Sequence, residues 1–295
     1  MRRAAAQPQD WTTRPERGTV PAIRLFAGLA RRVGRPAARL LLAPICAYFL
    51  IFSPAAGAVS SDYLQRILGR APTIRDRWRH FHCFAACLLD RIFLLNGRAD
   101  LLDITVHGEE IVTAHRAGCL LFGAHIGSFE VLRTLGNRHP DAQVCLVMYE
   151  ANAQKTRAVL NAINPALAIN IIGLGQPGAM LAVKARLDEA HFVGLLPDRT
   201  LDGGERKQLR FLGTLAWFPT GPFRMAVLLK HPVVLMLGLY RGGRAYDVHF
   251  EILAEPADLA AENAIDTMMR RYAARLEYYC KRAPYNWFNF YHFWA

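Results

Sequence analysis

The stretch "LLFGAHIGSFEVLRTLG", residues 120–136, joins a strand pattern to a helix pattern through a short turn. An apolar run ends at Gly123, and the spacing typical of an amphipathic helix begins a few residues later. The pattern predicts a strand over 119–125 and a helix around 128–135, with His125 on the turn between them. A strand that leads directly into a helix is the repeating unit of an α/β fold.

The same alternation of strand and helix patterns continues to the end of the chain. The predicted strands are 142–149, 168–174, 192–198, 232–240 and 245–253, the last with the alternation of an edge strand. The predicted helices are 152–161, 176–190, 219–230 and 257–282. These patterns predict an α/β fold whose largely parallel sheet is flanked by helices. Before this region, residues 60–97 have helical periodicity and predict one helix that ends at Asn96-Gly97.

The first 59 residues differ in composition from the rest. Residues 1–22 are polar and proline-rich, which predicts a disordered tail. Residues 23–59 carry several arginines before the apolar run Leu40–Phe52, which predicts a basic and hydrophobic membrane-anchor helix that dips into the membrane or barely spans it. The arginines are expected on the cytoplasmic side. A cleaved signal peptide, suggested by the small residues 56–58, and a buried core helix are the alternatives.

The net charge of +12 indicates an anionic partner. Nucleic acid fits poorly, because the basic residues are dispersed and no nucleic-acid-binding motif is present. An anionic membrane surface or an acidic carrier protein fits better. The six cysteines are scattered in mostly apolar surroundings, which predicts buried, reduced thiols. Neither a metal site nor a bound cofactor is predicted.

His125 and Glu130 are the candidate catalytic pair. On one continuous helix, five residues would place them about 140° apart, so they would not share a face. If His125 lies on the turn and Glu130 on the helix, the carboxylate can reach the imidazole. His125 would then act as a general base, with Glu130 fixing its tautomer. No Gly-x-Ser-x-Gly elbow is present, so direct attack without a covalent enzyme intermediate is expected. An ordinary structural corner is the alternative.

Two further motifs are expected near this corner. The stretch "GLLPDRT" (194–200) ends a predicted strand with Asp198-Arg199, at the same edge of the sheet. The stretch "FLGTLAWFPTGPFRMA" (211–226) places Gly221 between two prolines just before a helix. A surface ion pair and a plain loop are the structural alternatives for these two motifs.

Taken in order, these motifs resemble those of the bacterial lipid A late acyltransferases, the lauroyl and myristoyl transferases. The resemblance runs from about residue 25 to the end, and its most specific part is the block 211–226. It implies an acyltransferase domain over 60–295, with His125 as general base and Glu130 as its partner. It also implies substrate-binding roles for the following residues: Asp198, Arg199, Arg157 and Gly221.

The resemblance further implies a place and a reaction. These enzymes work on the inner face of the bacterial cytoplasmic membrane and move a fatty acyl chain from acyl carrier protein, or from coenzyme A, to a hydroxyl of a lipid or glycolipid acceptor. The stretch "YEANAQKTR" (149–157) departs from the family's Tyr-Arg-Pro pattern, which leaves the acceptor open. The tail "PYNWFNFYHFW" (284–294) is similar to a branch found with aryl polyene and related pigment-lipid pathways.

Several alternatives stay open at this point. The same histidine would serve a thioester or lipid hydrolase that activates water instead of a lipid hydroxyl. A non-catalytic protein that binds the membrane surface would also explain the charge and the apolar N-terminal run. The aromatic tail fits a membrane interface, an acyl tunnel or ordinary core packing.

Overall fold

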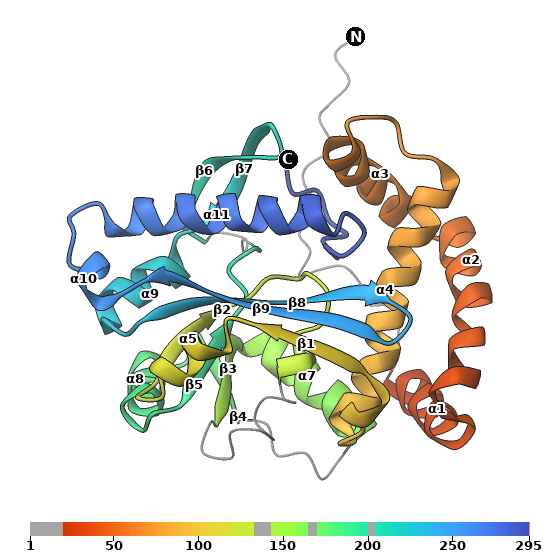
Figure 1. Ribbon diagram of the computed structural model, residues 1–295, viewed down its shortest axis with the longest axis horizontal. Coiled ribbons are helices and arrows are strands. Elements are labelled where there is room, and N and C mark those ends of the chain that lie inside the picture. The colour runs from red at the N-terminus through yellow and green to blue at the C-terminus, as the bar shows by residue number, and fades with distance from the viewer. Residues whose placement is uncertain (1–19, 133–142, 165–169, 200–203, 295) are drawn as a thin grey trace.

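The computed structural model describes residues 20–132, 143–164, 170–199 and 204–294. Helices form the N-terminal part: α1 (Val20–Leu40), α2 (Leu42–Phe52), α3 (Pro54–Leu68) and α4 (Ile74–Leu95). In the α/β body that follows, further helices surround a central sheet (Figure 1): α5 (Glu109–Ala114), α7 (Glu150–Ile163), α8 (Ala179–Asp188), α9 (Gly221–Leu229), α10 (Pro256–Leu259) and α11 (Ala264–Arg282).

The central sheet has seven strands in the order β1-β9-β8-β2-β5-β3-β4. Their bounds are β1 (Asp103–His107), β2 (Cys119–Phe122), β3 (Val144–Tyr149), β4 (Asn170–Leu174), β5 (Phe192–Leu195), β8 (Val233–Gly242) and β9 (Ala245–Ala254). Strands β8, β2, β5, β3 and β4 run parallel, β9 is antiparallel to β8, and β1 is parallel to β9. The predicted α/β fold with a largely parallel sheet is confirmed.

The sheet differs from the prediction at one edge. Strand β9 is not an edge strand, because β1 pairs along its outer side. Strand β1 was not predicted, since its residues alternate between exposed and half-buried and include no apolar run. The hairpin of β6 (Arg206–Phe211) and β7 (Thr214–Pro219) was also not predicted, because most side chains of β6 are charged or polar and exposed.

Strand β2 is buried on both faces of the sheet. Leu120 and Phe122 belong to a core shared with α8, α9 and α11, whereas Cys119 and Leu121 belong to a core shared with α1, α4 and α7. Figure 1 shows α11 along one side of the sheet and α7 on the other. A parallel strand covered by helices on both faces has a continuous apolar sequence, as "CLLF" does. This strand leads directly into the His125 turn.

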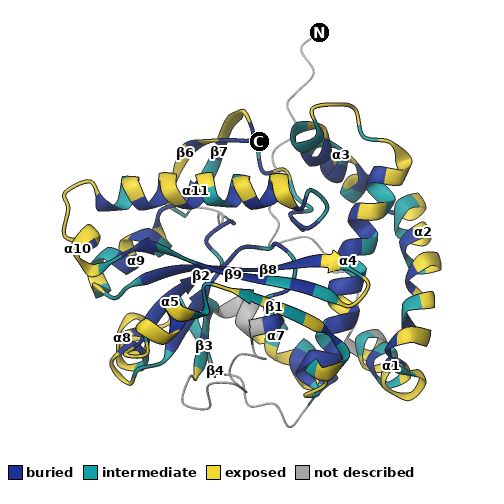
Figure 2. Ribbon diagram, in the orientation of Figure 1, coloured by how far each residue is buried: buried dark blue, intermediate teal, exposed yellow. Residues whose placement is uncertain are grey.

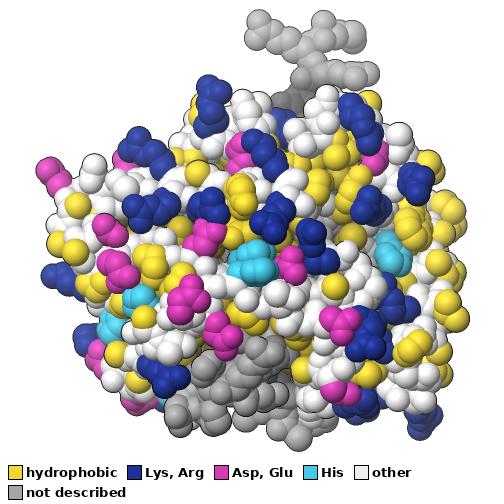
Figure 3. All heavy atoms as spheres, viewed as in Figure 1, with side chains coloured by type: hydrophobic (Ala, Val, Ile, Leu, Met, Phe, Trp, Pro, Cys, Tyr) yellow, Lys and Arg dark blue, Asp and Glu magenta, His cyan; other side chains and the backbone are white. Residues whose placement is uncertain are grey.

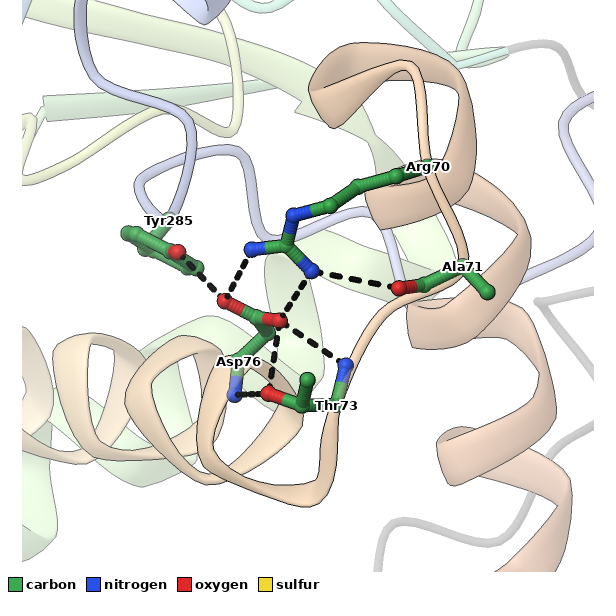
Figure 4. Close-up of polar contacts among 5 residues, drawn as sticks. All are labelled: Arg70, Ala71, Thr73, Asp76 and Tyr285. Atoms are coloured by element: carbon green, nitrogen blue, oxygen red, sulfur yellow. Dashed lines mark hydrogen bonds and ion pairs between the residues drawn. The ribbon is translucent and has the colours of Figure 1, made fainter.

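The single helix predicted over 60–97 is two helices. Helix α3 ends at Gly69, which has the left-handed φ of 65° that terminates many helices. Thr73 then caps α4 together with Asp76, whose carboxylate also binds Arg70 and accepts a hydrogen bond from Tyr285 at 2.8 Å (Figure 4). Through Asp76, this capping box connects the turn between the two helices to Tyr285 in the C-terminal segment. Helix α4 ends at Leu95, beside the predicted Asn96-Gly97 stop.

A buried ion pair joins α1 to the body of the protein. The guanidinium of Arg35 donates to both carboxylate oxygens of Asp90 on α4, at 2.7 and 2.9 Å. The hydroxyl of Tyr246 on β9 donates to the same carboxylate at 2.9 Å. Arg35 was expected among the arginines at the membrane surface, but it is only 5% exposed and binds inside the protein.

Replacing Asp90 with asparagine is expected to lower the free energy of unfolding by about 3 kcal/mol, because it leaves the buried charge of Arg35 uncompensated. Asp100→Asn is the matched control, since Asp100 forms an ion pair with Arg98 that is exposed on both sides. Urea unfolding followed by circular dichroism measures both variants, and no measurable change is expected for the control. An equally small effect of Asp90→Asn would contradict a structural role for this pair.

Helices α1 and α2 have exposed positions along their outer side (Figure 2), and several of these positions hold large apolar residues. The members are Leu25, Leu29, Val33, Leu40, Leu41, Tyr48, Ile51 and Phe52. Within the described residues, no one helix has both the length and the apolar composition needed to cross a membrane. The segments Ile23–Leu40 and Leu42–Phe52 meet these requirements only as a pair, and they are bent by 67° relative to each other.

Candidate active site

The turn after β2 is built around a close approach of two backbones. Gly127 has a φ of 60°, and a Cβ atom at this position would lie 1.8 Å from the carbonyl oxygen of Gly238 on β8. Only glycine fits such a contact. Gly127 thus holds the turn against β8, and His125 lies on this turn outside any helix. The prediction that the residues around His125 are not helical is confirmed.

Glu130 begins a short 3₁₀ helix, η2 (Glu130–Leu132). This agrees with the prediction that Glu130 is helical, although η2 has the tighter 3₁₀ geometry instead of the expected α-helix. The last part of the helix predicted around 128–135 lies outside the described residues.

His125 meets Asp198 because β2 and β5 are neighbours in the sheet. Phe122 at the end of β2 is in register with Leu195 at the end of β5, and each of the two polar residues follows three positions later. Ring nitrogen Nδ1 of His125 lies 2.7 Å from Oδ1 of Asp198. The backbone N–H of His125 donates to Oδ2 of the same carboxylate at 2.8 Å. The pair therefore lies at the carboxyl ends of two parallel strands, where α/β proteins bind ligands.

Asp198 is fully buried, and its environment keeps it ionised. Burial alone raises the pKa of a carboxyl group, but the charge of His125 in its protonated form, the hydrogen bonds from His125 and the charge of Arg199 outweigh this effect and lower the pKa of Asp198 to about 2. The indole Nε1–H of Trp287 donates to Oδ2 at 3.0 Å. Three donors therefore fix the orientation of this carboxylate.

His125 is held as a neutral base. Burial and the positive charge of Arg199 lower the pKa of its imidazole, and they outweigh the opposing effect of Asp198. With Asp198 ionised, Nδ1 donates to the carboxylate, which leaves the lone pair on Nε2 to accept a proton. The side chain is 28% exposed. A hydroxyl group of a substrate can therefore approach it.

The imidazole of His125 donates its hydrogen bond to Asp198 and not, as expected, to Glu130. Glu130 instead forms an ion pair of 2.5 Å with Arg91 on α4. The sequence shows that His125 and Glu130 are five residues apart. The contact of His125 with Asp198 depends instead on the order of strands in the sheet, which the spacing of residues does not reveal. A catalytic role for Glu130 stays a prediction.

Arg199 connects the site to the C-terminal segment. Its guanidinium donates to the side-chain oxygen of Asn289 at 3.0 Å and to the carbonyl of Phe288 at 3.1 Å. The N–H of Phe288 in turn donates to the carbonyl of His125 at 2.7 Å. Arg199 is therefore close to His125 and Asp198, and its guanidinium binds the C-terminal segment that covers them.

The aromatic tail is part of the core. Trp287 is fully buried, and Phe288 and Phe293 are 6% and 4% exposed. Asn286 both accepts from the N–H and donates to the carbonyl of Tyr240 on β8. Of the three interpretations of the tail, core packing therefore describes these residues. The contact of Trp287 with Asp198 had no signal in the sequence beyond the high aromatic content of the tail.

The two remaining candidate residues lie on other elements. Arg157 is on α7 and donates to the carbonyl of Ile171 on β4, three strands from β2 in the sheet. Gly221 is the first residue of α9, after Thr220. Two residues later, the ring of Phe223 lies 5.4 Å from that of Phe122 on β2. Gly221 thus begins a helix that packs under the site.

The chemistry available at this corner is that of a general base. A neutral imidazole can accept a proton from a hydroxyl group, and a buried ionised carboxylate beside it can orient the ring and stabilise the positive charge that the ring acquires. The six cysteines are all buried, and burial raises the pKa of the Cys119 thiol to about 12. All six are free thiols, so the predicted buried, reduced cysteines are confirmed.

A comparison with protein-family models identifies a family for most of the chain. The family model described as "bacterial lipid A biosynthesis acyltransferase" matches residues 95–295, a range that includes the pair and the tail over it. A search among curated proteins gives no match.

Proposed function

The chain belongs to the bacterial lipid A biosynthesis acyltransferase family, and from this we propose that it moves a fatty acyl chain from the thioester of acyl carrier protein to a hydroxyl group of a lipid or glycolipid. The family supports an acyltransferase activity. The observation that carries the mechanism is the 2.7 Å contact between His125 and the buried carboxylate of Asp198.

In the proposed mechanism, Nε2 of His125 removes the proton from the acceptor hydroxyl. The oxygen then attacks the carbonyl carbon of the thioester, and the tetrahedral intermediate releases the thiolate of the donor. The protonated imidazole gives its proton to this thiolate, which leaves His125 neutral again. Asp198 stabilises the imidazolium during the reaction and keeps the proton on Nδ1 between reactions.

The acyl group passes directly from donor to acceptor in this mechanism. A covalent intermediate would need a reactive serine or cysteine beside His125. The burial and raised pKa values of Cys119 on β2 and Cys145 on β3 argue against a thiolate nucleophile.

Acyl carrier protein is the proposed donor on grounds of charge. The protein has a net charge of +12, and carrier proteins of this kind are acidic. Arg206, Lys207 and Arg210 expose their side chains along β6. One of them, Lys207, is partly neutralised by an ion pair with Asp266.

The proposed location is the inner face of the cytoplasmic membrane. The exposed apolar side chains of α1 and α2 and the exposed residues Arg24, Arg31 and Arg32 support binding to an anionic lipid surface. In this proposal the bent pair α1–α2 acts as the anchor that the sequence suggested.

The double substitution Ile51→Asp and Phe52→Asp is expected to lower membrane binding by at least about tenfold, because it removes two apolar side chains from the lipid and adds charge. Leu181→Asp is the matched control, since Leu181 is 73% exposed on α8, away from these helices. Sedimentation of the purified protein with phosphatidylglycerol vesicles measures the bound fraction. Equal sedimentation of the double variant and the wild type would place membrane binding elsewhere.

The experiment that tests the function supplies membranes containing the protein with radiolabelled acyl-acyl carrier protein. Label in an organic-extractable lipid other than free fatty acid supports the proposal, whereas label only in free fatty acid indicates a hydrolase. A parallel assay with acyl-coenzyme A at equal concentration distinguishes the two donors, and faster transfer from coenzyme A would overturn the proposed donor.

A further inference from the structure

Three side chains with metal-binding atoms meet at the β1 edge of the sheet. His107 on β1 lies directly beside His249 on β9, because these two residues are partners in the parallel register. Asp247 lies two residues before His249 and points to the same face. The ring nitrogens and carboxylate oxygen that these three residues offer lie within 4.8 Å of one another.

The face of β9 that carries Asp247 and His249 is opposite to the face that carries Val248 and Phe250. Val248 and Phe250 belong to the core shared with α4 and α7. Asp247 and His249 therefore project to the opposite face, the side of the sheet along which α11 runs (Figure 1). The two histidines and the aspartate are separate from the His125 pair.

His249 has a buried nitrogen without a partner. Its side chain is 7% exposed, and among the described residues its Nε2 has no hydrogen-bond partner. The ring stacks on that of His107 at 4.5 Å and also contacts the ring of Tyr279 at 5.0 Å. Buried polar atoms are almost always satisfied, so an unpaired imidazole nitrogen indicates a missing partner.

We propose that His107, Asp247 and His249 form a binding site for a divalent metal ion of the zinc type. Two imidazole nitrogens and one carboxylate oxygen are donors that Zn²⁺ accepts, with water in the remaining position. Atoms bound to one zinc ion at about 2.1 Å lie roughly 3–4 Å apart, so the ligands need to move by about 1 Å. His107 is exposed and is free to make this adjustment.

The neighbouring charges set the conditions for binding. Arg241 forms an ion pair of 3.4 Å with Asp247, so the metal must compete with it for the carboxylate. The positive charge of Arg282 near His249 disfavours a bound cation, whereas the negative charge of Glu251 favours one. The carboxylate of Glu251 is itself bound by Arg275 and Tyr279. Figure 3 shows one side of the molecule, on which a histidine side chain near the middle of the view has acidic and basic side chains around it.

A metal ion at this position would connect the edge strand β1 to β9. Among the described strands, β1 pairs only with β9, and the ion would add a side-chain connection to the backbone hydrogen bonds between these two strands. Zinc is therefore expected to raise the midpoint of thermal unfolding of the wild type and to leave that of a His107→Ala variant unchanged.

The test uses the full-length protein without a histidine tag, purified in detergent, treated with EDTA and then titrated with Zn²⁺ by calorimetry. The wild type is expected to bind one equivalent, and His107→Ala and Asp247→Asn are expected to bind at least about tenfold more weakly. Arg241→Ala is expected to bind more tightly, because it removes the competitor for Asp247. His115→Ala is the matched control with unchanged affinity, since His115 contacts Glu255 outside the site.

Three outcomes would overturn the proposal: no binding to the wild type, binding that His107→Ala and Asp247→Asn leave unchanged, or a loss of binding in His115→Ala equal to that in His107→Ala. His249→Ala removes a buried ring and can unfold the protein, so the decisive variant is His107→Ala, whose ring is exposed. Replacement of zinc by Co²⁺ adds a direct readout. The visible absorption of a bound Co²⁺ ion should be present in the wild type and absent in His107→Ala.

Discussion

Replacing His125 with alanine is expected to reduce acyl transfer by about 10²–10⁴-fold, the contribution that a positioned general base makes to catalysis. The acceptor hydroxyl has a pKa far above neutral, so without a base it seldom attacks the thioester. Labelled lipid formed per unit time from acyl-acyl carrier protein measures the effect. His231→Ala is the matched control, since His231 is partly exposed and pairs with Asp188 on α8. Transfer that survives His125→Ala would remove this residue from the mechanism.

The pH profile of the wild type gives an independent check on His125. The base works only when its imidazole is neutral, so activity is lost as pH falls through its pKa. Because burial and Arg199 lower this pKa from the ordinary value of 6.5, the acid limb of kcat/KM is expected below pH 6.5. An acid limb above pH 7 would indicate that a different group titrates.

Replacing Asp198 with asparagine is expected to cause a comparable loss, about 10²–10⁴-fold in kcat, at nearly unchanged KM. The carboxylate accepts hydrogen bonds from Nδ1 of His125, the backbone N–H of His125 and the indole of Trp287. An amide offers one oxygen and one NH₂ group in their place. The NH₂ group would face a donor or would favour the tautomer with the proton on Nε2, which cannot act as a base.

Comparing Glu130→Gln with Asp198→Asn shows which of the two carboxylates orients the imidazole of His125. Glu130 binds Arg91 instead of the imidazole, so this variant is expected to retain activity within about tenfold of the wild type. Thermal unfolding followed by circular dichroism must show that both variants are folded, because Asp198 is fully buried. A loss of activity confined to Glu130→Gln would reverse the assignment and restore the His-x4-Glu pair suggested by the spacing.

The strands that line the site were visible in the sequence because they are covered on both faces. Strand β2 contributes to a different core on each side, and a strand in this position requires an unbroken apolar run such as "CLLF". Strand β1 was not visible, because its side chains are partly exposed and its pairing with β9 relies on backbone hydrogen bonds. The break between α3 and α4 had a local signal, Gly69 followed by Pro72, which the helical periodicity on both sides concealed.

The contacts of the C-terminal segment show a different limit of the sequence. Trp287 binds Asp198 and Phe288 binds the backbone of His125, across separations of 89 and 163 residues. The aromatic composition of the tail was evident, but it fits a membrane interface, a tunnel and a core equally well. Burial decides among these, and burial is a property of the packed elements.

The sequence by itself determined the α/β fold and the position of His125 off the helix, since apolar periodicity and Gly127 are local properties of the chain. The tertiary structure decided which carboxylate reaches the imidazole. Glu130 is nearer in sequence, but its side chain binds Arg91 on α4. Asp198 reaches Nδ1 because β5 is hydrogen-bonded to β2 in a register that aligns the two strand ends. Strand order is set by packing over the whole sheet, and residue spacing within a single motif carries no information about it.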